Sequence, residues 1–326
     1  MNFLKDLSLG VLIFLTAAGC SAKVELPASR MEATEKLTKI LENDHSYAPV
    51  IRWAKDTLWI YLPGTSALYT IEGSSAKPSS TPKKYILQYI SVLYQDHVFL
   101  IEHDVVEATK ITTGAGMSTR YSQAFNEQYR NATTAISRTF FAAQNPPSFI
   151  VLVIADIQSG LATKTIFYAE DLKRYFTQSI PPEEYAVRVR TEPYGDPNIV
   201  GDRQGKHISY DEIFFPEFLA KQIAYRISFK FQNSDFPPDK NVDEEILDAV
   251  VKTVQAYNFN DFAHVIFQDL RAKEEQTVTR EQIDRLREPL PQEDPLNKSK
   301  IITIDFSDIW KKDQDPQGSL QKDLVE

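Results

Sequence analysis

The densest group of potential metal ligands in this 326-residue chain is a short stretch of histidines and acidic residues. Its members are Asp96, His97, Glu102, His103 and Asp104. Imidazole and carboxylate groups are common ligands of zinc and other divalent ions. On an extended strand, however, His97 and His103 share a face but lie about 20 Å apart. The spacing therefore favours the solvated edge of a strand. The alternative is a metal site in which His97, His103 or Asp104 is joined by ligands from elsewhere in the chain.

Two aspartates stand at matching places, each at the end of an apolar run. Asp156 closes the run from Phe149, and Asp269 closes the run from Phe262. Two carboxylates brought together could divide the acid and base roles of a hydrolytic reaction. An aspartate after a strand more simply accepts hydrogen bonds from the amides of a turn, and we predict this structural role for both. His264, inside the second run, is predicted to be a hydrogen-bonded core residue. No catalytic residue, metal site or cofactor is assigned.

Two glycine-containing stretches are similar in outline to phosphate-binding loops. Residues 201–206, Gly-Asp-Arg-Gln-Gly-Lys, place a lysine after the second glycine as such a loop does. The spacing is one residue short, and His207 stands where a magnesium-binding hydroxyl is required. Residues 114–116, Gly-Ala-Gly, are followed by Thr119 at the place of the third glycine of a dinucleotide fingerprint. We interpret the first stretch as an ordinary loop and the second as a hinge before a helix.

The chain has a single cysteine, Cys20, at the end of a short apolar segment. Lys5 precedes the mainly apolar residues 7–15, and small residues follow them. Such a segment is too short to span a bilayer and is typical of a cleaved secretory signal. With one thiol among these residues, a disulfide within the sequence and a cysteine-based zinc site are both excluded.

The four residues ending at Cys20, Ala-Ala-Gly-Cys, resemble the lipobox of bacterial lipoproteins. Leucine is the commonest residue at the place of Ala17. The resemblance implies cleavage between Gly19 and Cys20 and a diacylglycerol carrying palmitate-type chains on the Cys20 thiol. Two or more acyl chains hold a protein stably on a membrane. With Ser21 after the anchor, the resemblance also implies export to the outer membrane, facing the periplasm.

The composition narrows the possible partners. The net charge is −9, and nucleic acid binding requires clustered lysine and arginine, so a nucleic acid partner is not expected. The 19 phenylalanines, 15 tyrosines and 3 tryptophans can build a substantial core. The length suggests roughly two domains.

Hydrophobic spacing predicts the elements that must position these groups. We predict a helix at 31–41, a hairpin joining 57–62 to 67–71, and a second hairpin joining 85–93 to 98–106. A further helix is predicted to begin at a cap formed by Ser118 or Thr119. The apolar face of that helix is formed by Tyr121, Phe125, Tyr129, Ala132, Ile136 and Phe140. Pro216 is predicted to start another helix.

An internal repeat is visible in the second half of the chain. Residues 149–156 align with 262–269, and residues 171–175 align with 282–286. Each copy is predicted to run helix, strand, strand, helix and strand, with the last strands at 185–189 and 301–306. This order is similar to that of ring-building modules in lipoproteins and other envelope proteins of secretion assemblies. The similarity covers element order alone.

These patterns together predict an α+β fold, with small antiparallel sheets packed on helices and two related helix-strand-strand-helix-strand modules. The predicted divisions are a signal peptide at 1–19, a lipidated stalk at 20–30, modules at 31–113, 114–236 and 237–309, and a disordered tail at 310–326.

The sequence favours a lipid-anchored protein of the bacterial cell envelope that binds or scaffolds another component and is not an enzyme. Its expected partners are the membrane, through Cys20, and envelope proteins or further copies of itself. Two alternatives stay open, namely a periplasmic hydrolase or metal-dependent enzyme, and a carrier of a small apolar ligand.

Overall fold

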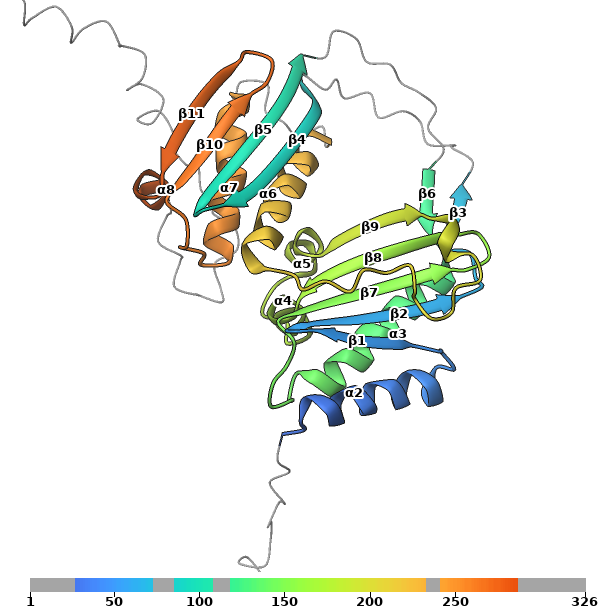
Figure 1. The fold of residues 1–326 in the computed structure, drawn as a ribbon. Helices are drawn as coiled ribbons and strands as arrows, with labels where there is room; N and C mark the ends of the chain where they lie inside the picture. Colours follow the sequence, from blue (N-terminus) through green and yellow to red (C-terminus); the bar gives the residue numbers. More distant parts are fainter. Residues whose placement is uncertain (1–26, 73–84, 108–117, 233–240, 287–326) are drawn as a thin grey trace, which may run out of the picture.

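The computed structural model describes residues 27–72, 85–107, 118–232 and 241–286. Within these residues the fold is α+β, as predicted, with two helix-covered sheets and a two-stranded ribbon (Figure 1). Outside the described residues lie the predicted signal at 1–19 with Cys20, the glycines of 114–116, the predicted boundary at Pro237 and Pro238, and the predicted strand and tail beyond residue 286.

The first sheet has five strands in the order β1-β2-β7-β8-β9. All its neighbouring strands are antiparallel except β2 and β7, so the sheet is mixed rather than purely antiparallel. All eight residues of β7 are buried, as the continuous apolar run predicted. The strands are β1 (Val50–Ala54), β2 (Thr57–Gly64), β7 (Phe149–Asp156), β8 (Leu161–Tyr168) and β9 (Arg190–Gly195).

Two helices cover one face of this sheet. The predicted first helix is confirmed as α2 (Arg30–Lys39), which continues as a π-helical turn, η1 (Ile40–Asp44). The long helix α3 (Gln123–Phe140) packs beside it. The cap of α3 is Ser122, whose hydroxyl accepts a hydrogen bond from the Phe125 amide, so the predicted cap at Ser118 or Thr119 is wrong.

The reason is that Ser118 and Thr119 belong to a strand. β6 (Ser118–Tyr121) pairs with β3 (Tyr69–Glu72) and forms the two-stranded ribbon. The predicted hairpin between 57–62 and 67–71 is therefore wrong, because β2 pairs with β1 and β7 instead of β3. The local sequence pattern predicted the positions of β2 and β3 but did not identify the strands with which they pair.

The second sheet has the order β11-β10-β5-β4. The predicted hairpin of β4 and β5 is confirmed, and its turn residues Asp96 and His97 both have positive φ, as a tight two-residue hairpin turn requires. β5 and β10 are parallel, so this sheet is mixed as well. The strands are β4 (Tyr85–Gln95), β5 (Val98–Glu107), β10 (His264–Asp269) and β11 (Glu274–Thr279).

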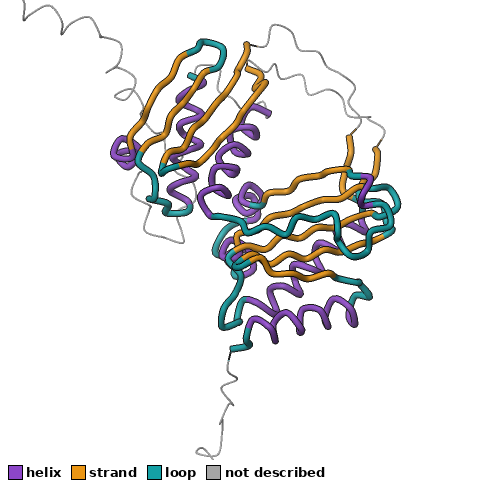
Figure 2. Tube along the Cα trace, viewed as in Figure 1, coloured by secondary structure: helices purple, strands orange, loops and turns teal. Residues whose placement is uncertain are grey.

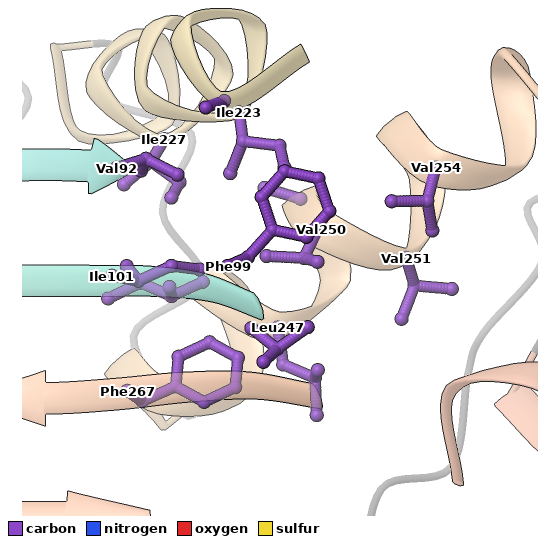
Figure 3. Packing of buried hydrophobic residues seen from close by; sticks show 14 of the residues in the cluster. Val92, Phe99, Ile101, Ile223, Ile227, Leu247, Val250, Val251, Val254 and Phe267 are labelled. Carbon is purple, nitrogen blue, oxygen red and sulfur yellow. The ribbon is translucent and has the colours of Figure 1, made fainter. Parts of the chain in front are cut away.

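Helices α6 (Phe215–Gln232) and α7 (Val242–Ala256) cover one face of the second sheet. Figure 3 shows the core between them, where Phe99 of β5 and Phe267 of β10 meet Leu247 and Val250 of α7. Pro216 is the second residue of α6, close to the predicted helix start.

The element order of the repeat is confirmed over four elements. α3, β7, β8 and α4 (Ala169–Phe176) correspond to α7, β10, β11 and α8 (Arg280–Leu286). In each unit the first strand of this series pairs in parallel with a strand of an earlier hairpin, β2 or β5. The hairpin β4–β5 lies between β3 and β6 in the chain, so the two sheets are interleaved in sequence. The sheets therefore draw strands from more than one of the modules predicted at 31–113, 114–236 and 237–309.

The strand predicted at 185–189 is wrong. Residues Pro182–Arg188 form helix α5, and β9 begins after it at Arg190. Pro182 occupies the first turn, where the missing amide hydrogen is not needed, and Glu183 and Glu184 suit the positive end of the helix dipole. The alternation of residue types that suggested a strand is overridden by these start signals.

Candidate functional site

The face of the first sheet opposite α2 and α3 is crossed by the segment between β9 and α6. Figure 2 shows this loop, in teal, running over the strands. Three hydrogen bonds tie it to β2: the Trp59 indole donates to the Asp211 carbonyl at 2.9 Å, the Tyr61 hydroxyl donates to the Asp202 carbonyl at 2.6 Å, and the Ile213 amide donates to the Thr57 hydroxyl at 2.9 Å. The loop is therefore attached at both its beginning and its end.

A groove of about 640 Å³ opens between this loop, strands β8 and β9, and the first turns of α6. Its apolar lining comes from the sheet and from the helix. Trp59 and Phe218 are 7% and 1% exposed, and Val153 and Ile166 lie beside them. These side chains offer an apolar surface to an occupant.

Three cations from three different elements line the same groove: Lys164 of β8, Arg190 of β9 and Lys221 of α6. Glu192 forms ion pairs with two of them. Its carboxylate accepts from the Lys164 ammonium at 2.7 Å and also pairs with Arg190. Within the described part of the chain, Lys221 forms no ion pair. Glu192 is therefore shared by two of the three cations, and Glu217 lies one helical turn before the third, Lys221.

Burial lowers the pKa of all three cations, and neighbouring positive charges add to this effect for the two lysines. Burial lowers the pKa of Lys164, and the Arg190 charge lowers it further. The pKa of Lys221 is also lowered, first by burial and then by Arg190 and Lys164, against the opposing effect of Glu217. Burial alone lowers the pKa of Arg190. Like charges that destabilise one another in this way would be stabilised by a bound anion.

Three further acidic residues of the groove, Asp196, Asp211 and Glu212, have partners of their own. The Asp196 carboxylate accepts from the Asn198 amide at 2.9 Å, and the Asp211 carboxylate accepts from the Ser209 hydroxyl at 2.5 Å. Glu212 pairs with Lys55 at 2.6 Å. The groove thus combines an apolar floor with one end where Lys164, Arg190 and Lys221 gather beside the carboxylates of Glu192 and Glu217.

The rim of the groove contains an aspartate–histidine pair that the sequence analysis did not identify. The Asp202 carboxylate lies 2.8 Å from Nδ1 of His207 and accepts hydrogen bonds from the amides of Gln204, Lys206 and His207. Burial opposes ionisation of Asp202, but these hydrogen bonds outweigh it and lower its pKa to about 2. The amides of Gln204, Lys206 and His207 are therefore bound by the chain's own carboxylate, as expected of an ordinary loop rather than a phosphate-binding loop.

The second ring nitrogen of His207, Nε2, is buried. Its side chain is 3% exposed, and Nε2 has no hydrogen-bond partner among the described residues. The ring of Tyr61 packs edge-on at 5.4 Å between centroids. In the sequence, the only sign of this arrangement was an aspartate five residues before a histidine in a glycine-containing loop.

The residues considered as metal ligands are not brought together. His97 of the hairpin turn lies 2.7 Å from the Asp261 carboxylate, and Asp104 pairs with Arg271 at 2.9 Å. His103 is 1% exposed on the helix-covered face, 3.5 Å from Asp243, so its predicted place on a solvated edge is wrong. His103 is buried because it lies on the same face of β5 as buried Ile101. Its partner on β10, Asp269, likewise lies on the same face as buried Phe267.

No group of three or more histidine, cysteine, aspartate or glutamate side chains suited to a metal ion occurs in the described ranges. The turn role of the two aspartates is confirmed. Asp156 accepts from the amides of Gln158 and Ser159, and Asp269 accepts from those of Arg271 and Ala272.

The core position predicted for His264 is wrong. His264 is exposed at the start of β10, because the residues that face the helices along this strand are Val265 and Phe267.

Comparison with known proteins identified no relative of this chain. Among the described helices, none combines the length and apolarity needed to cross a membrane. No family model, curated protein or solved structure matches the chain.

Proposed function

We propose that this protein is a lipid-anchored binding protein of the bacterial cell envelope, and that its groove takes a small ligand with an anionic group and an apolar body. The observation that carries the binding role is that Lys164, Arg190 and Lys221 gather at one end of a groove with an apolar floor, where Glu192 pairs with only the first two. The envelope location rests on the lipobox-like residues that end at Cys20.

The geometry of the groove supports an amphipathic anion over a purely apolar ligand. A purely apolar ligand would bury Lys221 without an ion-pair partner and leave Lys164 and Arg190 with Glu192 alone, and unpaired buried charge is costly. A carboxylate or phosphate placed between Lys221 and Arg190 would accept charge-assisted hydrogen bonds. The rest of the ligand would lie along the apolar lining formed by Trp59, Val153, Ile166 and Phe218.

Calorimetric titration of the purified full chain tests the proposal with octanoate as the probe. Octanoate is expected to bind, and acetate and octyltrimethylammonium are expected to bind more weakly or not at all. Acetate has the charge without the tail, and octyltrimethylammonium has the tail with the opposite charge.

A pair of lysine variants locates the site. Lys221→Gln should weaken octanoate binding about tenfold, the effect of losing one charge-assisted hydrogen bond. Lys39→Gln, on the exposed surface of α2, is the matched control and should leave binding unchanged. Equal weakening by both variants, or stronger binding of the cationic probe, would contradict the proposal.

The hydrolase alternative has its own readout in the same preparation. Turnover of an octanoyl ester that is lost in His207→Ala would favour an enzyme, because Nε2 of His207 is the buried nitrogen at the rim. The binding proposal expects no turnover.

A further inference from the structure

The two sheets differ at one edge. In the first sheet, β9 pairs with the outer side of β8 and forms the fifth strand. In the second sheet, β11 corresponds to β8, and within the described residues it is the last strand at that edge. An unpaired strand edge presents free amide and carbonyl groups, which proteins normally cover or pair.

The chain spacing identifies a segment that fits this edge. Between the end of β8 and the start of β9 lie residues 169–189, which is 21 residues. After the end of β11, the same length of 21 residues, 280–300, leads to Ile301. α4 and α8 each begin directly after the strand, so the two units keep a constant offset of 111 positions from this point.

The residues at the expected position have a strand pattern. Residues 301–306 read Ile-Ile-Thr-Ile-Asp-Phe. In the first sheet, Arg190 pairs with Ile166 and Thr191 pairs with Thr165. The same offset places Ile301 opposite Thr277 and Ile302 opposite Gln276.

This register gives the segment a consistent pair of faces. Val278 of β11 is buried against the helices, and Gln276 lies on the same face. Ile302, Ile304 and Phe306 would then face the helices, and Thr303 and Asp305 would face the other side. A shift of one residue would reverse this assignment.

We propose that residues 301–306 add to the edge of β11 as an antiparallel fifth strand, supplied by the same chain. Residues 287–300 between α8 and this segment can span up to about 46 Å when extended, which is ample for a return along β11. The equal spacing in the first unit, where β9 comes from the same chain, favours this source over a second copy.

Disulfide cross-linking in the full chain tests both the pairing and its register. With Cys20→Ser as background, two double variants are compared, Gln276→Cys with Ile302→Cys and Thr277→Cys with Ile301→Cys. Adjacent antiparallel pairs alternate between closer and wider spacing, so at least one should oxidise to an intramolecular disulfide. Gln276→Cys with Gln317→Cys is the control and should not cross-link efficiently.

Each outcome of the cross-linking experiment either supports or overturns the proposed pairing. A cross-linked monomer from an in-register pair, absent from the control, supports it. Disulfide-linked dimers without cross-linked monomer would show that a second copy supplies the strand and would overturn it. Failure of both in-register pairs, or equal cross-linking of the control, would overturn it as well.

Hydrogen exchange gives a second measurement without new thiols. Thr303→Pro should speed exchange of β11 amides by about tenfold or more, because proline disfavours a paired strand and the partner amides lose their protection. Ser319→Pro is the control and should have no effect. Unchanged exchange in a folded Thr303→Pro protein would contradict the pairing.

Discussion

The Asp171 carboxylate of α4 accepts a hydrogen bond from the Tyr257 hydroxyl at 2.7 Å, across the junction between the two helix-covered sheets. Asp171 is 3% exposed, and its other oxygen accepts from the Arg188 guanidinium at 2.8 Å. Arg188 also donates to Glu184, which in turn accepts from Arg226 of α6. A buried polar network therefore joins the end of α7 and the face of α6 to helices α4 and α5.

The first prediction concerns this network. Tyr257→Phe should lower the free energy of unfolding by about 1–3 kcal/mol, because it leaves a buried carboxylate oxygen without its donor. Urea denaturation followed by circular dichroism measures the change. Tyr225→Phe, on the more exposed surface of α6, is the matched control and should cost less than about 0.5 kcal/mol. Equal effects of the two variants would show that the hydroxyl of Tyr257 contributes no specific stabilisation.

The second prediction concerns the pH dependence of the loop at the groove rim. The folded pKa of Asp202 is lowered from 3.8 to about 2 by hydrogen bonds that outweigh burial. Ionised Asp202 therefore contributes stability above its unfolded pKa of about 4, and this contribution is lost as the pH falls toward 2. The stability difference between the wild type and Asp202→Asn should be greatest near neutral pH and shrink below pH 4. A difference that stays constant from pH 7 to pH 2 would contradict this linkage.

The third prediction concerns the core of the second sheet. Phe99 is fully buried beside Val250 of α7 (Figure 3). Its ring also packs edge-on against that of Phe259. Phe99→Ala should lower the free energy of unfolding by about 3–5 kcal/mol through lost burial and a cavity. Leu93→Ala removes a side chain that is 55% exposed on neighbouring β4, and it should cost much less. Chemical denaturation of both variants checks the difference.

The fourth prediction concerns the anchor. If Cys20 is acylated, radioactive palmitate should label the wild-type protein in growing bacteria, and Cys20→Ala should abolish the label, since no other thiol is present. Ser21→Ala is the control and should leave labelling intact. Labelling that persists in Cys20→Ala would refute Cys20 as the acylation site.

Local pattern was sufficient for many elements because their signals lie within a few residues. The apolar run ending at Asp156 predicted a buried strand, and the turn residues after Gln95 predicted a hairpin. The similarity between the two halves also predicted the equivalent turn roles of Asp156 and Asp269, since a carboxylate placed after a strand reaches the nearby amides in either copy. The α+β class followed from these short-range features.

Strand partners and the groove depended on tertiary structure. β2 pairs with β7, more than eighty positions later in the chain, and no local pattern of Thr57–Gly64 encodes that partner. Lys164, Arg190 and Lys221 are unremarkable charges in the sequence and become a site only because two neighbouring strands and a helix bring them to one groove. Burial also reversed the expectations for His103 and His264, because the side of the strand that meets the helices is set by packing between distant segments. Residue spacing determines contacts within an element, whereas the burial of apolar faces across the whole chain selects which elements meet.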